Sequence, residues 1–131
     1  ESSRRFGEVA GDVISQALTI IDGIVVLGGG LTGAAKYFMP SLLAEMRGEI
    51  GTFAGDRFPR LQMQTYDLDS PEEAAEFVRE KSVPVAVPHS EERVRYHHIR
   101  QTPVVRSKLG ASRAIALGAY AFAIAELDRR Q

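Results

Sequence analysis

The residues with the clearest chemical potential form the segment Gly28-Gly29-Gly30-Leu31-Thr32-Gly33. They follow an apolar run, residues 24–27, that predicts a strand, and they precede a helical pattern. A strand that delivers glycines to a helix start leaves backbone N–H groups and the positive end of the helix dipole free to bind phosphate. Glycine suits this position because a Cβ would hold the ligand away and because the turn can need a positive φ. We predict a nucleotide-binding turn whose contact residues are Gly28, Gly29, Gly30 and Leu31.

The same glycines also fit a second kind of site, the dinucleotide fingerprint. Gly28, Gly30 and Gly33 satisfy its GxGxxG spacing. Two features of the surrounding sequence disfavour it. A whole helical pattern precedes the strand, whereas the fingerprint opens its domain, and the acid expected about 20 residues later is missing. The next strand pattern ends only at Asp67 or Asp69.

The other polar clusters favour structural roles. His97 and His98 are adjacent, so their side chains point to opposite sides of an extended chain, and no carboxylate lies at a ligand-like helical spacing from them. The arginines between positions 93 and 106 follow two glutamates, which favours a solvated face over a nucleic-acid surface. Asp22 precedes the strand and therefore lies away from the glycines. We predict no catalytic residue and no metal ligand in this chain.

Hydrophobic periodicity predicts the elements that hold the glycine turn. Apolar residues at three- and four-residue spacing indicate a helix over residues 4–21. Its apolar stripe consists of Val9, Val13, Ala17 and Ile20 or Ile21. The β-branched run 24–27 predicts a central strand buried on both faces, as in a parallel sheet. A second helical pattern covers residues 31–46, and Pro40 within it predicts either a kink or a new helix start.

The second half of the sequence alternates strand, loop and helix signals. Ser70, Pro71 and Glu73 predict a helix start with a capping box. Two prolines in residues 83–88 restrict that segment to an edge strand or a linker. The predicted elements after residue 46 are a loop over 48–59, a half-buried strand over 61–66, a helix over 70–81, the extended segment 83–88, a strand over 99–105 and a last helix from 109 or 112 to 129.

The composition is that of an ordinary globular domain. Of the 131 residues, 44% are hydrophobic and 25% are charged, and the formal net charge is −1. This charge gives no general attraction to nucleic acid or to an anionic membrane. Cysteine is absent, which excludes disulfides and thiolate metal sites. We expect a cytoplasmic protein. The lack of an initiating Met, with a helical pattern that opens almost at once, indicates a piece of a longer chain.

Two segments resemble the C-terminal half of the ROK family, which contains bacterial sugar kinases and sugar-responsive repressors. In the first, residues 9–18 and 21–30, a helix leads through a strand into the three glycines. In the second, residues 107–119, a Gly introduces a small-residue helix that ends in Gly-Ala, as in that family's closing segment. This second segment departs from the family pattern. Ala111, Ser112, Arg113 and Ala114 follow its Gly where the family usually has an Asn-Asp or Asn-Glu pair and Ala-Gly.

The resemblance implies an α/β fold, part of a ribonuclease-H-like (actin-like ATPase) C-terminal lobe with a small, mostly parallel sheet flanked by helices. Residues 1–131 would form a single domain, a fragment of that nucleotide-binding lobe. In the intact protein, an ATP-dependent, glucokinase-like sugar kinase, this lobe would hold the adenosine and α-phosphate side of ATP at Gly28, Gly29 and Gly30. A missing lobe would supply the sugar, the catalytic base and the Mg²⁺ site. The fragment alone would be inactive.

Two other functions fit the same sequence, namely the sugar-sensing lobe of a ROK-type repressor and a protein-interaction module without nucleotide. We also expect a homo-oligomer, because the last helix carries a face of small residues beside Phe122 that a missing lobe would otherwise cover. That face consists of Ala114, Gly118, Ala121 and Ala125. The stretch from Gly48 to Gln101 looks longer than in the family and can add an arm to this contact. We expect no contact with nucleic acid or membrane through this fragment.

Overall fold

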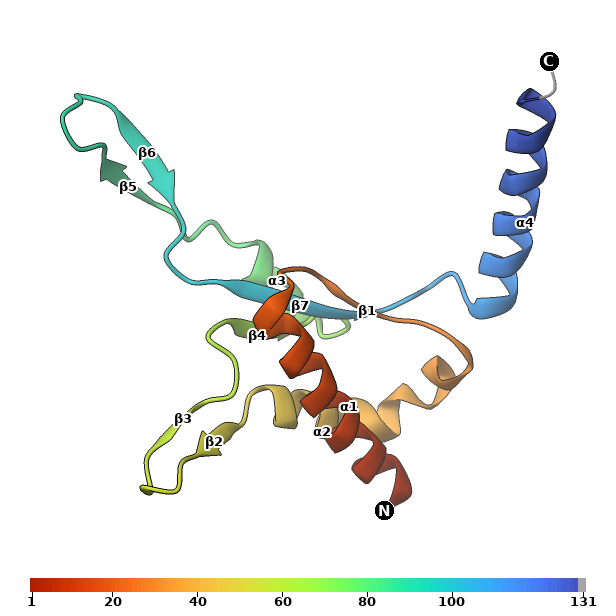
Figure 1. Cartoon of the computed structure of the whole chain (residues 1–131), viewed down its shortest axis with the longest axis horizontal. Helices are drawn as coiled ribbons and strands as arrows, with labels where there is room; N and C mark the ends of the chain where they lie inside the picture. The colour runs from red at the N-terminus through yellow and green to blue at the C-terminus, as the bar shows by residue number, and fades with distance from the viewer. Residues whose placement is uncertain (130–131) are drawn as a thin grey trace.

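The computed structural model describes residues 1–129. Its elements are α1 (Ser2–Ile20), β1 (Val25–Leu27), the 3-10 helix η1 (Gly30–Ala34), α2 (Ala35–Met46), β2 (Glu49–Gly51), β3 (Arg57–Pro59), β4 (Gln64–Asp67), α3 (Pro71–Val78), β5 (Val83–Ala86), β6 (Arg93–Tyr96), β7 (Gln101–Arg106) and α4 (Ala111–Asp128). The α/β class and the parallel sheet flanked by helices are confirmed (Figure 1). No helix within the described range has the length and hydropathy of a membrane span.

The main sheet has the strand order β1-β7-β4, and both pairings are parallel. β7 is therefore the central strand, and its Val104 is completely buried. β1 lies at the edge, where Val26 is 60% exposed. The prediction of a strand at residues 24–27 is confirmed, but the prediction that it is central and buried on both faces is wrong. Apolar, β-branched residues favour a strand, whereas its place in the sheet depends on pairing with distant segments.

Helices α1 and α2 pack together against one face of this sheet. Most of the core lies at this contact. Its buried hydrophobic residues are Leu18, Ala35, Phe38, Met39, Leu42, Leu43, Met46, Leu61 and Val104. Pro40 lies inside α2, which continues through it to Met46. Of the two alternatives predicted at this proline, a kink or a new helix start, the new start is not found.

The face of α1 that meets α2 is made of small residues. Gly7, Gly11 and Ser15 are buried there, whereas Val9 and Val13 are 58% and 59% exposed. A Cβ built on Gly11 would lie 2.6 Å from the carbonyl oxygen of Leu42, so only glycine permits this approach of the two backbones. The helix was predicted correctly, but the valine stripe expected to be its packing face points outward.

The second half of the chain adds α3 and two hairpins. Ser70 caps α3 by accepting a hydrogen bond from the Glu73 amide, as predicted, but the Glu73 carboxylate accepts instead from the Asp67 amide and from Arg47. The expected loop at residues 48–59 contains the antiparallel hairpin β2–β3. The extended segment 83–88 contains β5, which pairs only with β6, in agreement with the predicted edge position.

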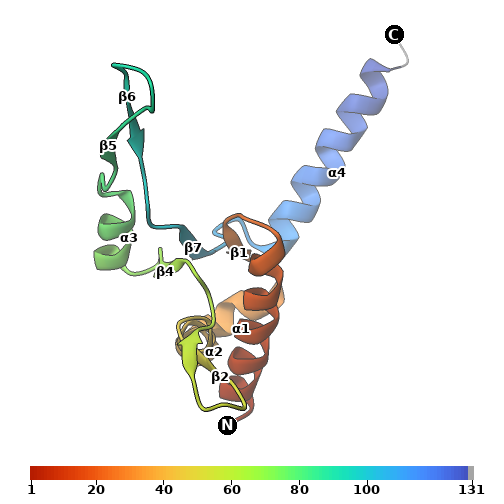
Figure 2. The same cartoon turned by 60° about the vertical axis from the view of Figure 1, so that its left-hand side comes forward.

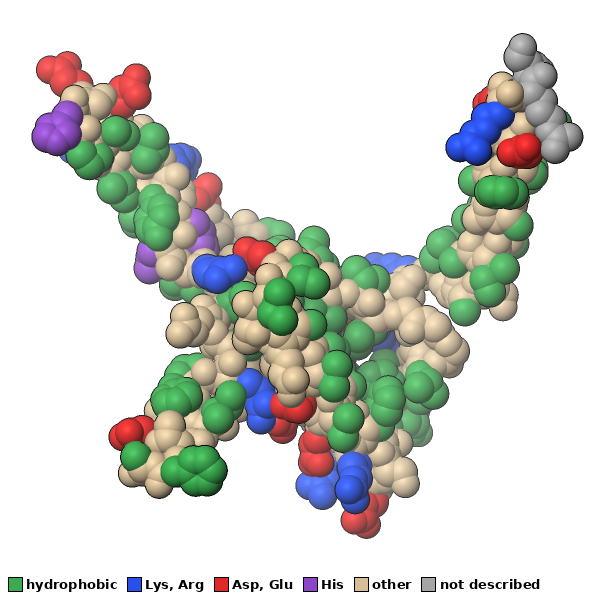
Figure 3. All heavy atoms as spheres, in the orientation of Figure 1, with side chains coloured by type: hydrophobic (Ala, Val, Ile, Leu, Met, Phe, Trp, Pro, Cys, Tyr) green, Lys and Arg blue, Asp and Glu red, His purple; other side chains and the backbone are tan. Residues whose placement is uncertain are grey.

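Both hairpins and α4 project from the body of the molecule. The two hairpins leave it on one side, while α4 leaves it on the other (Figures 1 and 2). Apolar side chains cover much of the visible surface of α4, and the space-filling view shows a splayed shape (Figure 3). The two hairpins and α4 therefore carry apolar side chains that are not packed in the core.

Candidate nucleotide-binding site

Three chain segments meet at the carboxyl edge of the parallel sheet. The glycine turn follows β1, the turn that leads to α4 follows β7, and Asp69 follows β4. In open sheets of this kind, ligands bind in the crevice outside the carboxyl ends of the strands. The structure therefore places all four predicted contact residues, Gly28 to Leu31, at the edge where a ligand site is expected.

The glycine turn exposes its backbone. Gly29 has φ +97°, a conformation that side chains with a Cβ rarely adopt, and a Cβ on Gly29 or Gly30 would meet no atom within 4 Å. The first hydrogen bonds of the turn run from the amide and hydroxyl of Thr32 to the Gly29 carbonyl, at 3.3 and 2.8 Å. Thr32 is thus the first residue of the turn whose amide donates a hydrogen bond within the described residues. The amides of Gly29, Gly30 and Leu31 come before it and are available to a ligand.

The helix after this turn differs from the prediction. Residues 30–34 form the 3-10 helix η1, and the α-helix begins only at Ala35. The positive end of the α2 dipole therefore lies one short helix away from the glycines, and the turn offers backbone donors more than a dipole.

The turn after β7 lies directly beside the glycine turn. The Ser107 amide donates to the Leu27 carbonyl at 2.8 Å, and a Cβ on Gly28 would lie 3.9 Å from the Ser107 Cβ. Gly110, at φ +75°, redirects the chain into α4. A cavity of about 450 Å³ opens here. It is lined by Thr32, Gly33, Asp69, Arg106, Ser107, Lys108 and Gly110.

Charged residues that the sequence analysis did not single out complete this edge. Arg106 donates from Nε to Asp69 at 2.5 Å, and this pair borders both the cavity described above and a second one of about 380 Å³ beside α2. Lys36 lines the second cavity and Lys108 the first. The two cavities share the Asp69–Arg106 pair, which brings both signs of charge to this edge of the sheet.

A third cavity, of about 300 Å³, lies on the apolar side of the turn. It is lined by Phe6, Ala10, Val26, Leu27, Gly28, Leu31, Thr32, Phe38 and Leu42. Apolar walls beside exposed amides and charged groups are the usual composition of a small-molecule site.

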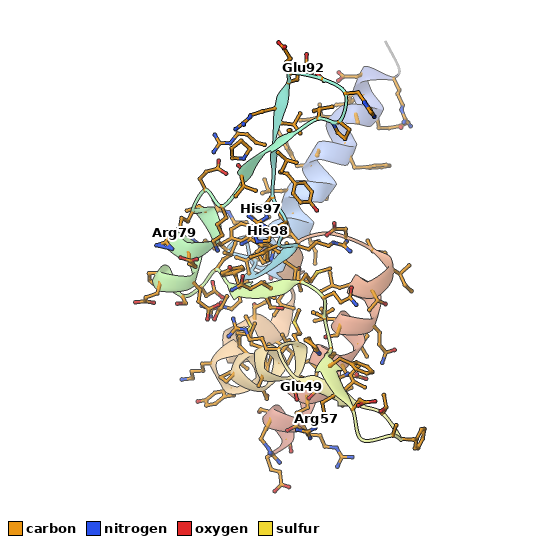
Figure 4. The ribbon with its side chains drawn as sticks, turned by 90° about the vertical axis from the view of Figure 1, so that its left-hand side faces the viewer. Glu49, Arg57, Arg79, Glu92, His97 and His98 are labelled. Carbon is orange, nitrogen blue, oxygen red and sulfur yellow. The ribbon has the colours of Figure 1, made fainter. Side chains whose placement is uncertain are left out.

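The remaining candidate residues lie elsewhere. His97 and His98 follow β6 at the base of the β5–β6 hairpin (Figure 4), and their rings stack with centroids 6.4 Å apart instead of pointing to opposite sides of the chain. Asp22 pairs with Arg100 at 3.1 Å, on the amino side of the sheet. Within residues 1–129, no group of three or more histidines and carboxylates is placed to hold a metal ion.

The acidic residues of α3 form local contacts. Hydrogen bonding from Lys81 lowers the pKa of Glu76, and the same contact raises the pKa of Lys81. The pKa of Glu72 is lowered first by its backbone hydrogen bond and then by Ser70. Each of these shifts has a local hydrogen bond as its largest cause.

Comparison with known proteins agrees with this geometry. The chain is similar to the crystal structure of a glucokinase from Parabacteroides distasonis, with a TM-score of 0.73 and 42% sequence identity over 92% of this chain. The chain has the fold of part of a glucokinase. It spans 32% of the length of that protein. No family model and no curated protein matches it.

The sequence identity relates this chain to sugar kinases and not only to the α/β fold class. Because the aligned part includes almost the whole chain at 42% identity, the sheet and its carboxyl edge correspond to a sugar-kinase-like lobe. The predicted sugar-kinase relationship is confirmed at this level. Membership of the ROK family, ATP binding and the contact residues stay predictions.

Proposed function

We propose that this chain is the nucleotide-binding lobe of an ATP-dependent sugar kinase of the ROK family. The observation that carries the proposal is the glycine turn at the carboxyl edge of the sheet, in a chain whose fold is that of part of a glucokinase. In this proposal the amides around Gly28, Gly29, Gly30 and Leu31 bind the adenosine and α-phosphate side of ATP. The sugar substrate is phosphorylated only when the rest of such a kinase is present.

The local structure fits a ligand that combines anionic phosphates with a planar nucleobase. The open backbone at Gly29 and Gly30 leaves room for phosphate oxygens, which side chains would otherwise obstruct. Lys36 and Lys108 on the neighbouring rims provide positive charge. The apolar cavity beside Leu31 offers a surface for a planar base.

In this proposal, Mg²⁺ and the catalytic base come from the remainder of a longer kinase. Phosphoryl transfer needs a metal that bridges the phosphates and a group that orients the attacking hydroxyl. The described residues offer no cluster able to hold a metal ion. We therefore propose that the metal, the base and the sugar site lie in the remainder of a longer, cytoplasmic kinase, and that this chain contributes only to holding the nucleotide.

Binding of ATP to the chain, followed by NMR, tests the proposal. We expect ATP to shift the amide signals of Gly29, Gly30 and Leu31. Gly29→Ala should weaken binding about tenfold or more, because its φ of +97° strains any residue with a Cβ. Gly118→Ala is the matched control, since a Cβ there meets no neighbour and lies in α4.

Two results would contradict the proposal. One is a set of shifts confined to residues 89–106, and the other is equal ATP affinity in Gly29→Ala and in the parent chain. A longer protein that contains this lobe could also bind sugar in the absence of nucleotide and fail to phosphorylate it. That result would instead favour a sugar-responsive repressor.

A further inference from the structure

The main sheet has a free edge along β4. Its strand order is β1-β7-β4, so among the described strands β4 pairs with β7 only. Alternate residues of a parallel strand direct their backbone groups to opposite sides. The Gln64 amide donates to the Arg100 carbonyl, on the side of β7. The backbone groups of Thr65 and Asp67 therefore face the other way, toward the free edge.

Two side chains engage this free edge. Arg47 donates from Nη2 to the Thr65 carbonyl at 3.1 Å, and the Glu73 carboxylate accepts from the Asp67 amide at 2.7 Å. The same Arg47 nitrogen donates to Glu73 at 2.5 Å, so the donor and the acceptor are joined in one ion pair. Arg47 directly follows α2 and Glu73 lies in the first turn of α3. Two helices beside β4 thus contribute to the contact (Figure 2).

A further strand would need the same two backbone groups. In a parallel ladder, one residue of the added strand donates its N–H to a carbonyl and accepts at its own C=O from the amide two residues later. Arg47 and Glu73 supply such a donor and such an acceptor, at Thr65 and Asp67. The Asp67 carbonyl is engaged as well, because the Ser70 amide donates to it at 3.2 Å. The hydrogen bonds that would attach another strand here are therefore already made within the chain.

The free edge can be reached from solvent. A cavity of about 420 Å³ lies along β4 beside the ion pair. It is lined by Arg47, Gln64, Thr65, Tyr66, Glu72, Glu73 and Glu76. The side chains of Arg47 and Glu73 are 40% and 34% exposed, so the pair itself lies at the surface. An extended chain thus has room to approach β4, and the groups that it would meet first are those of the ion pair.

We propose that Arg47 and Glu73 together guard the free edge of the sheet against pairing with an extended segment of another protein chain. Exposed strand edges are templates for such pairing and for aggregation, and proteins often block them with charged side chains. This guard does more than repel, because it occupies the donor and the acceptor that the incoming strand would use. Both side chains and both backbone groups belong to this chain, so the contact needs no other part of a longer protein. It also lies apart from the proposed nucleotide site, whose glycine turn follows β1 at the other edge of the sheet.

Hydrogen exchange followed by NMR tests the contact itself. Glu73→Met removes the acceptor of the Asp67 amide but retains a long side chain with good helix propensity. We expect the Asp67 amide to exchange at least tenfold faster than in the parent chain, because its hydrogen bond is lost. The Leu68 amide, which donates to the Val104 carbonyl on the side of β7, is the internal control and should keep its exchange rate.

Thioflavin T fluorescence tests the consequence of losing the guard. At equal concentration, Arg47→Met and Glu73→Met should each form ordered aggregates at least tenfold faster than the parent chain, because β4 can then pair with another strand. Arg60→Met is the matched control. It removes a different guanidinium from two carboxylate partners, and so destabilises the chain, but it leaves the edge of β4 engaged. It should aggregate more slowly than the other two variants.

A charge-reversed double variant, Arg47→Glu with Glu73→Arg, separates edge protection from ion pairing. It retains opposite charges at the two positions, but it directs a carboxylate toward the Thr65 carbonyl and a guanidinium toward the Asp67 amide. Neither backbone group then has a partner, so we expect rapid exchange and aggregation, as in the single variants. Parent-like behaviour of this double variant, unchanged exchange of Asp67 in Glu73→Met, or equal aggregation of Arg47→Met and Arg60→Met would overturn the proposed guard.

Discussion

The close contact between α1 and α2 predicts that Gly11→Ala destabilises the chain. In most helix interiors this change is favourable, because alanine has a helix propensity about 1 kcal/mol better than that of glycine. Here the new Cβ would lie 2.6 Å from the Leu42 carbonyl oxygen and 2.8 Å from the Glu45 Cβ. Neither atom is the free end of a flexible side chain, so relief requires the two helices to move apart.

The magnitude follows from the packing that this movement disturbs. Leu42 is completely buried at the contact, and Leu18 and Phe38 lie in the same cluster. Overpacking of a dense core typically costs 1–3 kcal/mol, which exceeds the propensity gain. We expect a net loss of about 1–2 kcal/mol in the free energy of unfolding, or roughly 3–8 °C in Tm.

Urea and thermal unfolding followed by circular dichroism measure this loss. Gly118→Ala is the matched control, because it makes the same chemical change in a helix where the added Cβ meets nothing within 4 Å. The control should unfold at the same denaturant concentration as the parent chain or at a slightly higher one. If Gly11→Ala is as stable as Gly118→Ala, the two helices are not in the close contact described, and the reasoning fails.

Four further predictions follow from other contacts. Arg60→Met should lower the free energy of unfolding by about 1–3 kcal/mol, measured in urea, because it leaves two partly buried carboxylate partners without their guanidinium. Lys81→Met should raise the pKa of Glu76 toward 4.5 in an NMR titration. Because the pKa of Glu76 is lowered in the folded chain, the contact stabilises the fold at pH values above the pKa of the unfolded state. This stabilisation is lost as the pH falls through the pKa of the folded state. A coupled assay should detect no sugar-dependent ADP release by this chain alone. Gly118→Arg should reduce any self-association through α4 in light scattering, and a parent chain that stays monomeric as concentration rises would contradict that contact.

Local signals in the sequence were enough for the elements around the glycine turn. The apolar run 24–27, the glycines and the helical pattern after them each reflect chemistry within a few residues. The place of β1 at the sheet edge could not be read in this way, because β7, its neighbour in the sheet, lies more than 70 residues later in the chain. Strand order depends on such long-range pairing, which hydrophobicity does not encode.

The packing face of α1 was misread for a different reason. Periodicity selects the most apolar stripe, and Val9 and Val13 form one. The structure instead buries Gly7, Gly11 and Ser15, whose four-residue spacing was visible in the sequence. Small residues contribute little to an apolar stripe, yet they permit the closest helix approach, so their spacing was the signal that would have identified the face.

Some residues of the candidate site could be predicted from local sequence and others could not. Gly28, Gly29 and Gly30 were identified because a strand–glycine–helix order is local. Asp69 and Arg106 were not, since they are 37 residues apart and meet only because β4 and β7 run parallel to the same edge. Once parallel pairing is known, the residues that follow each strand become candidates without further information.

Parallel pairing also separates the glycine turn from the β2–β3 hairpin. Each loop that follows a strand of the main sheet reaches the carboxyl edge, where the glycines and the Asp69–Arg106 pair lie, whereas the hairpin precedes β4. Phe53 in the hairpin turn is completely exposed, so Phe53→Ala removes no packing contact among the described residues. We therefore expect Phe53→Ala to retain the ATP-induced shifts at Gly29 and Gly30. Loss of these shifts in a variant whose circular dichroism spectrum is unchanged would mean that the hairpin and the glycine turn are coupled through the sheet.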